Sequence, residues 1–160
     1  MMEKIRAQEV YGIINKHNKS KEQILSILLE IQEASGRNYV PEECAQIVAQ
    51  ELGLSLSKVY DVLTFYAMFS LKPRGKYILE ICKSAPCHVN GSKNVRDMFE
   101  KELGISIGET TEDNMFTLQY SSCFGACDIA PAVKIGGKVY GNLNEQKVKE
   151  IVDLYRKEGQ

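Results

Sequence analysis

Four cysteines in the second half of the chain set the strongest limit on what this sequence can become. They form two pairs, Cys82 with Cys87 and Cys123 with Cys127, and thirty-five residues separate the pairs. Each pair begins where a short apolar run, typical of a strand, comes to an end. If the two strands are neighbours in a sheet, both loops leave the same edge and bring four sulfur atoms together. Such a set of thiols predicts a metal centre.

The loops around the cysteines bear on which metal is bound. All-sulfur sites hold zinc or iron–sulfur clusters, and the four- and three-residue gaps do not exclude zinc. A [2Fe–2S] cluster takes two cysteines on each iron, which suits two separated pairs. Pro86 stiffens the first loop, and the backbone N–H groups of Gly91 and Gly125 are expected to donate to sulfur. The residues therefore favour a cluster and leave zinc open.

The composition fits a cytoplasmic globular protein. Of its 160 residues, 44% are hydrophobic and 26% are charged, with a net charge of -1 at pH 7. A nearly neutral chain is a poor general partner for nucleic acid or anionic membranes. No apolar run is long enough for a membrane span, and the first ten residues lack the apolar stretch of a secretory signal. Thiols stay reduced in the cytoplasm, which again favours metal binding over disulfides.

Helical periodicity in the first half predicts a helical domain over residues 1–75. We expect helices over 3–16, 21–35, 41–53 and 56–69. Ser20 and Gln23 fit a capping box at the start of the second helix. The stretch from Leu71 to Gly75, which contains Pro73, breaks the pattern and marks a domain boundary.

The hydrophobic period changes after Gly75, and residues 76–160 predict a second domain with a small sheet. We expect strands over 76–81, 115–120, 132–135 and 138–140, the last two joined by a Gly-Gly hairpin turn. Ser92 is expected to cap a helix that runs through Leu103, and Asn144 is expected to cap a last helix. The order strand, helix, three strands, helix indicates a small sheet with two helices, in an α+β or α/β arrangement.

Around the cysteines the sequence resembles the NuoE-type subunit of respiratory complex I and its relatives in NAD-linked or electron-bifurcating hydrogenases and formate dehydrogenases. The resemblance rests on Cys82-x4-Cys87, on Cys123-Phe-Gly-Ala-Cys127-Asp-Ile-Ala-Pro131 and on Val139-Tyr-Gly-Asn-Leu143. Segments 39–43, 52–54, 59–66 and 71–73 of the helical half match too, so the likeness runs from about residue 20 to 157.

This resemblance implies an N-terminal helical bundle followed by a thioredoxin-like α/β [2Fe–2S] ferredoxin domain. It implies that Cys82, Cys87, Cys123 and Cys127 bind a [2Fe–2S] cluster. It also implies an FMN- and NADH-binding flavoprotein subunit as partner, with a further iron–sulfur subunit or a hydrogenase or dehydrogenase catalytic subunit.

The chemistry of such a centre predicts electron transfer. A cluster held by four thiolates has no open coordination position, so we expect no active site in this chain. Because NADH gives two electrons together and a cluster accepts one at a time, a flavin must transfer the electrons between them. The sequence contains neither G-x-G-x-x-G nor a P-loop, so we expect the flavin in a partner subunit. We expect an electron-transfer subunit of a soluble NAD(P)-linked complex, such as an electron-bifurcating or NAD-dependent hydrogenase. The alternatives are a respiratory NADH:quinone oxidoreductase, an NAD-dependent formate dehydrogenase and, from a different class, a structural zinc module.

Other single residues have plainer interpretations. Cys44 lies on the apolar face of its expected helix and is interpreted as a buried, inert thiol. His88 is interpreted as a surface histidine rather than a group coupled to the cluster, and His17 is expected to contact solvent. Asp128 and Glu80 near the cysteines would favour a low reduction potential by opposing added negative charge.

Two further sets of residues leave alternatives open. Core packing and contact with a flavoprotein are both compatible with the aromatic residues Tyr60, Phe65, Tyr66 and Phe69. A small, solvated basic patch is expected from Lys72, Arg74 and Lys76.

Residues 45–66 have the outline of a helix-turn-helix, but the second helix offers only Lys58 to DNA. A thioredoxin-like dithiol enzyme would need C-x-x-C, and both pairs here are longer.

Overall fold

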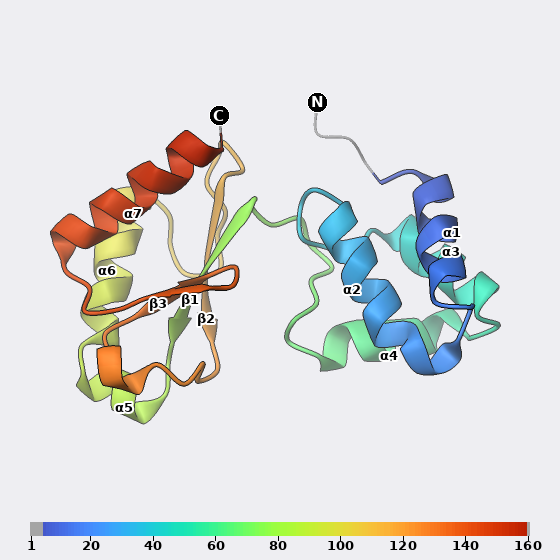
Figure 1. Cartoon of the computed structure of the whole chain (residues 1–160), viewed down its shortest axis with the longest axis horizontal. Coiled ribbons are helices and arrows are strands. Elements are labelled where there is room, and N and C mark those ends of the chain that lie inside the picture. The colour runs from blue at the N-terminus through green and yellow to red at the C-terminus, as the bar shows by residue number, and fades with distance from the viewer. Residues whose placement is uncertain (1–4, 160) are drawn as a thin grey trace. The chain divides into compact units, whose positions relative to one another are not determined.

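The structure is a computed structural model that describes residues 5–159, and it divides into two compact units. The first unit ends at Arg74 and the second begins at Gly75 (Figure 1). Each unit has its own apolar core. Within residues 5–159, no helix combines the length and the apolar character needed to cross a bilayer.

The first unit is built from helices. They are α1 (Ala7–Lys16), α2 (Ile24–Ala34), α3 (Glu42–Glu51) and α4 (Leu56–Phe65), with the 3-10 turn η1 (Lys21–Gln23) before α2. Helix α3 packs against both α1 and α4. The apolar residues spaced three and four apart on each helix point inward, and Val10, Ile27 and Val48 are fully buried.

The helix ends in this unit differ from the prediction. Helix α1 begins at Ala7, and residues 3 and 4 of the expected helix lie outside the described residues. The Ser20 hydroxyl donates to the Glu22 carboxylate instead of capping a helix, so the predicted capping box is wrong. Helix α4 ends at Phe65, four residues early, because the chain turns to an extended conformation at Tyr66.

A buried amide holds the segment that follows α4. The Gln32 side chain, 6% exposed, donates from Nε2 to the Met68 carbonyl oxygen at 2.9 Å. Its Oε1 accepts from the Ser70 backbone N–H at 2.8 Å. These bonds replace the helical ones that residues 66–69 were expected to make, and they place Phe69 in the core at 7% exposure.

The second unit is a four-stranded sheet with helices. The strands are β1 (Tyr77–Cys82), β2 (Phe116–Ser121), β3 (Val133–Ile135) and β4 (Lys138–Tyr140). They lie in the order β2-β1-β3-β4, with β1 and β2 parallel and the other pairs antiparallel. The four predicted strands and the hairpin between β3 and β4 are confirmed.

The remaining helices of this unit are α5 (Ala85–Val89), α6 (Ser92–Leu103) and α7 (Glu145–Glu158), with the 3-10 turn η2 (Cys127–Ile129). Helices α6 and α7 pack together on one side of the sheet (Figure 1). The Asn144 side chain accepts from the Lys147 backbone N–H at 2.9 Å, which confirms the predicted start of α7. Gly91, not Ser92, is the cap of α6. Helix α5 was not predicted.

Candidate functional site

Two parallel strands carry one end of each cysteine pair. Strands β1 and β2 are adjacent, and Cys82, the last residue of β1, pairs in register with Ser121 at the end of β2. Cys123 follows two residues later. Because parallel strands end at the same edge of a sheet, the loops that leave β1 and β2 begin side by side.

Two short helical turns carry the other cysteines. Cys87 is the third residue of α5, which begins after Ser84 and has Pro86 in its first turn. Cys127 is the first residue of η2. Each turn folds its own loop back four or five residues after the first cysteine, so that the second thiol of each pair returns toward the first.

The four thiols form a closed ring of interactions. Cys82 interacts with Cys87 and Cys123, and Cys127 interacts with the same two residues. The structure thus brings together all four cysteines that the sequence singled out. Among residues 5–159, no three His, Cys, Asp or Glu side chains are placed closely enough to hold a single metal ion.

The ring is buried on one side and open on the other. Cys82 and Cys87 are 1% and 4% exposed, whereas Cys123 and Cys127 are exposed. A group bound among these sulfur atoms would therefore lie at the surface of the unit, anchored from the core side.

The crowding shifts the pKa values of the thiols in opposite directions. For Cys82, burial raises the pKa, but hydrogen bonds from Ser84 and the neighbouring thiols outweigh burial and lower it. For Cys87, burial and the neighbouring Cys82 raise the pKa to about 12. Interaction with Cys123 raises the pKa of Cys127. Four thiolates cannot share this space without a compensating positive charge, which is what metal ions supply.

Backbone N–H groups point at the sulfur atoms. The Gly125 N–H donates to Cys123 Sγ at 3.4 Å, as predicted, and the Ser84 backbone donates to Cys82. Gly125 has a φ of +80°, a conformation that favours glycine. The expectation for Gly91 is wrong, because its N–H donates to the His88 carbonyl oxygen at 3.2 Å.

The carboxylates near the ring differ in their surroundings. Glu80 forms an ion pair with Lys134 at 3.1 Å and accepts from Gln119, so its negative charge is compensated. Asp128 is exposed beside Cys127. Any effect of a carboxylate on a bound group therefore falls mainly to Asp128.

The prediction for one histidine is confirmed, and the prediction for the other is wrong. His88 is exposed on α5, as expected. The prediction for His17 is wrong, since its side chain is only 14% exposed. Its ring nitrogens lie 2.5 Å from Gln23 Oε1 and 2.8 Å from Glu30 Oε1.

Cys44 and three basic residues are the other polar positions that the sequence singled out. Cys44 is 4% exposed in the core of the helical unit, which confirms its burial. Arg74 is not a solvated cation, because its Nε donates to the Asn38 carbonyl oxygen at 2.8 Å. Lys72 is exposed, and Lys76 lies over the Tyr77 ring, 5.4 Å from its centroid.

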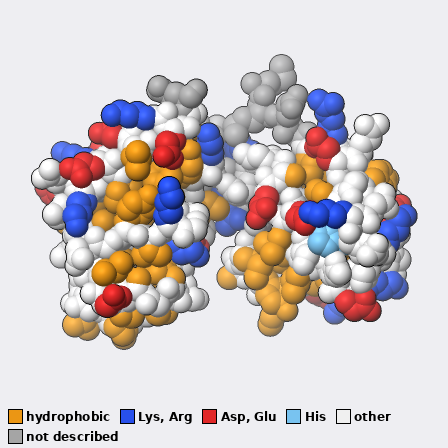
Figure 2. All heavy atoms as spheres, viewed as in Figure 1, with side chains coloured by type: hydrophobic (Ala, Val, Ile, Leu, Met, Phe, Trp, Pro, Cys, Tyr) orange, Lys and Arg blue, Asp and Glu red, His pale blue; other side chains and the backbone are white. Residues whose placement is uncertain are grey.

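The aromatic residues that the sequence singled out differ in how far they are exposed. Phe69 is buried, while Phe65 and Tyr66 are 80% and 36% exposed and meet edge to face at 5.0 Å. Apolar side chains gather on the surface of the helical unit (Figure 2). Within the stretch 65–71, the large exposed ones are Phe65, Tyr66, Met68 and Leu71.

Sequence reasoning missed Ser84 and the helix α5 that it begins. A serine followed two residues later by proline is a helix-start signal that could have found α5. The signal is weak because the helix is only five residues long.

Sequence comparisons match most of the chain to known proteins. A family model described as thioredoxin-like [2Fe-2S] ferredoxin matches residues 10–156. A component of the NADH-quinone oxidoreductase of Rickettsia felis is 39% identical over 128 residues, 80% of this chain and 77% of that one. The HndA component of the NADP-reducing hydrogenase of Solidesulfovibrio fructosivorans is 35% identical over 148 residues, 92% of this chain and 85% of that one.

A solved structure supports the fold. The NAD+-reducing [NiFe]-hydrogenase in its air-oxidised state matches with a TM-score of 0.69 over 82% of this chain, at 18% identity. The match covers 23% of the hydrogenase chain, so the fold of this chain is similar to one part of that larger polypeptide.

Proposed function

Because the chain belongs to the thioredoxin-like [2Fe–2S] ferredoxin family, we propose that it is an electron-transfer subunit that carries its cluster on Cys82, Cys87, Cys123 and Cys127. The observation that carries the proposal is the ring of four interacting thiols at the shared edge of β1 and β2. The cofactor of the family is a [2Fe–2S] cluster, which when bound gives and takes one electron at a time.

The residues around the ring fit such a cofactor. Four thiols supply two ligands for each iron, and the buried pair anchors the group while the exposed pair faces the surface. Ser84 and Gly125 direct N–H groups at sulfur, which stabilises negative charge on the ligands. On this proposal the chain transfers electrons and has no active site for a substrate of its own.

We further propose that the chain works inside a complex with an FMN- and NADH-binding flavoprotein subunit. The relatives named as parts of an NADH-quinone oxidoreductase and of an NADP-reducing hydrogenase support this assignment. A flavin is the group that converts a hydride into single electrons. A hydrogenase complex, electron-bifurcating or NAD-dependent, with a further iron–sulfur or catalytic subunit is our first choice, and the respiratory and formate dehydrogenase complexes are the alternatives. We place the complex in the cytoplasm, where thiols stay reduced.

Metal analysis tests the cofactor assignment. Anaerobically purified protein is expected to contain two irons and two acid-labile sulfides per chain, with visible absorption that dithionite bleaches. Cys→Ser at 82, 87, 123 or 127 should lose or distort the cluster, whereas Cys44→Ala should keep it. Colourless protein that binds one zinc, even after reconstitution, would overturn the assignment.

Affinity purification tests the complex. The full chain, purified from its own cells, should bring with it a subunit that contains FMN and oxidises NADH or NADPH. The other co-purifying subunits identify the branch: a hydrogenase, membrane subunits or a formate dehydrogenase. Recovery of the cluster-loaded chain alone at native abundance would count against a stable complex.

A further inference from the structure

A row of three polar side chains crosses the sheet beside the row that carries Cys82. Glu80 of β1 pairs in register with Gln119 of β2 on one side and with Lys134 of β3 on the other. Cys82 follows Glu80 by two residues on the same strand, so both side chains point to the same face of the sheet. Two residues of a strand span about 7 Å. A charge in this row therefore acts on Cys82 at short range.

The other face of β1 belongs to the apolar core. Leu79 and Ile81 alternate with Glu80 and Cys82 along the strand, and both lie in the core with residues of α6 and α7. The polar row is therefore on the face of β1 that turns away from these helices.

Both oxygens of the Glu80 carboxylate are engaged within the row. Oε2 lies 3.1 Å from Lys134 Nζ, and Oε1 accepts from Gln119 Nε2 at 3.4 Å. The side chains of Glu80 and Lys134 are 23% and 36% exposed, so water reaches the ion pair only in part. Charges in such a place interact more strongly than they do in bulk water. Lys134 thus cancels a negative charge on the Cys82 face of the sheet.

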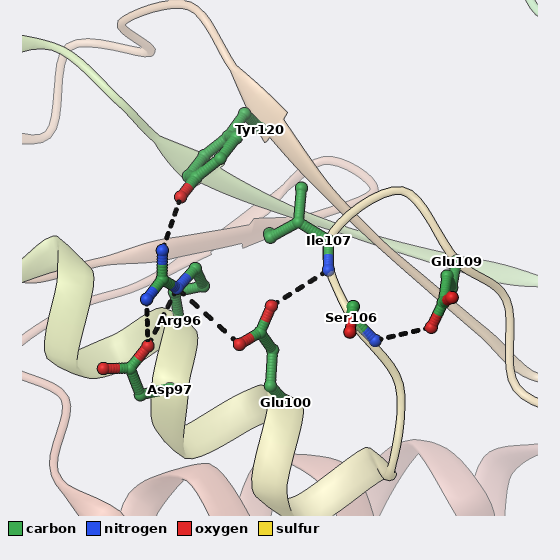
Figure 3. Close-up of polar contacts among 7 residues, drawn as sticks. All are labelled: Arg96, Asp97, Glu100, Ser106, Ile107, Glu109 and Tyr120. Atoms are coloured by element: carbon green, nitrogen blue, oxygen red, sulfur yellow. Dashed lines mark hydrogen bonds and ion pairs between the residues drawn. The ribbon is translucent and has the colours of Figure 1, made fainter.

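A second charged cluster at this end of the sheet lies on the opposite face. Tyr120 comes one residue before the in-register partner of Cys82, so its side chain points toward α6. There Arg96 donates to the Tyr120 hydroxyl at 3.4 Å (Figure 3). Arg96 is also paired with Asp97, to which its Nε donates at 2.8 Å, and with Glu100 at 3.7 Å. The sheet therefore separates this cluster from the Cys82 face.

We propose that Lys134 is a positioning residue that neutralises Glu80 and thereby raises the reduction potential of the cluster held in part by Cys82. The inference deepens the proposed function and rests on it, because the ring has this potential only when it holds its cluster. Reduction adds one electron, and so one negative charge, to the cluster and its thiolates, and no proton is taken up. An unpaired carboxylate nearby opposes that added charge, whereas a paired carboxylate opposes it far less.

A redox titration of the full, cluster-loaded chain tests this role. Visible absorption is followed against potential without oxygen, with dithionite as the electron donor, at about pH 8 and low salt. Lys134→Met keeps an apolar stem but removes the charge. Reduction should become roughly three- to tenfold less favourable, which lowers the midpoint potential by about 30–60 mV. Glu80→Gln should shift it upward by a similar factor, and the double variant should return to within about twofold of the wild type.

Lys138→Met is the matched control. Lys138 is exposed on β4 and pairs in register with Ile135, a core residue, so its side chain leaves the other face of the sheet. Removal of the same charge there should change the reduction equilibrium by less than about twofold. Lys134→Arg keeps the positive charge and should keep the wild-type potential.

The outcomes separate this inference from the proposed function. A midpoint potential that Lys134→Met leaves unchanged, or that Lys138→Met lowers equally, would overturn the role of Lys134 while the iron content still supports the cluster. A wild-type chain that holds no iron and sulfide would overturn both. Circular dichroism and the visible spectrum identify a variant that has failed to fold or to load its cluster, and Lys134→Gln, with the same expected shift, then takes the place of Lys134→Met.

Discussion

Cys44 has the same side chain as the four ring cysteines, but it lies in different surroundings. It lies on α3 among apolar neighbours, where burial and the nearby Glu43 raise the pKa of its thiol to about 11. The thiolate is the reactive form, so this residue is protected twice, by its pKa and by its burial.

We expect Cys44 to resist alkylation in the folded protein. In cluster-free protein at about pH 8, iodoacetamide should modify the exposed Cys123 and Cys127 first and reach Cys44 only when denaturant is added. Mass spectrometry of digested samples over time measures the order. Modification of Cys44 at the rate of Cys123 would show that the helical core is open.

His17 makes the stability of the helical unit depend on pH. Both ring nitrogens face acceptor oxygens, on Gln23 and Glu30, so the protonated ring satisfies both bonds. Hydrogen bonds to Gln23 and Glu30 raise the pKa of His17 above its ordinary 6.5, and those from Lys16 and His17 lower the pKa of Glu30 below 4.5.

The sign of each shift sets the pH window. The contribution of His17 is full below pH 6.5 and is lost as the pH rises through its raised pKa, and that of Glu30 is lost as the pH falls below about 4.5. Urea unfolding of the helical unit should therefore show greatest stability between these values. His17→Gln should flatten the decline on the alkaline side, and a decline that persists unchanged in His17→Gln would refute the assignment.

Single polar residues were the least predictable part of the sequence. Ser20, Gly91 and His17 each had a reasonable local interpretation, and each found a different partner in the fold. Glu30 lies thirteen residues from His17, so no local pattern could have paired them. The meeting of the ring cysteines was predictable because each pair follows a predicted strand, and two such strands side by side bring their loops together.

Elements with strong periodicity or a specific turn signal were predictable, and short ones were not. The hairpin at Gly136 and the cap at Asn144 are local signals that the structure confirms. Helix α5 is too short to show a period, and α4 ends at Phe65 because Gln32, far away in sequence, binds the segment that follows.

Gly75 determines how the chain enters β1. A Cβ atom at this position would lie 2.6 Å from the Phe116 carbonyl carbon, and the Gly75 N–H donates to Thr117 Oγ1 at 2.6 Å. We expect Gly75→Ala to push β1 away from β2 and to destabilise the second unit by about 1–3 kcal/mol.

Gly137→Ala is the matched control, because a Cβ there meets no atom within 4 Å. Thermal unfolding of the cluster-loaded protein compares the two variants. Equal melting temperatures for Gly75→Ala and the wild type would show that β1 tolerates the displacement.

At the scale of the molecule, each unit has an apolar core of its own. The core of the second unit draws all its buried apolar residues from the stretch between Leu79 and Tyr155, and that unit holds all four ring cysteines. We propose that the two units are separate domains, with the break between Arg74 and Gly75.

A fragment of residues 75–160 should fold and take up the cluster by itself. Circular dichroism and the visible spectrum after anaerobic reconstitution measure both properties. The reciprocal fragment, residues 1–74, should be helical and colourless. A fragment 75–160 that stays unfolded, or that loads only when residues 1–74 are added, would show that the units depend on each other.

The parallel pairing of β1 with β2 also imposes an order on maturation. The two halves of the sulfur ring belong to loops that meet only after α6 has crossed over and β2 has found its place in the sheet. On the proposed function, each half is until then only a dithiol, and the four ligands of one cluster exist together only once the sheet has formed. Delivery of iron and sulfide would therefore follow the pairing of β1 with β2, and binding of other metals to single dithiols would be a hazard of the unfolded chain.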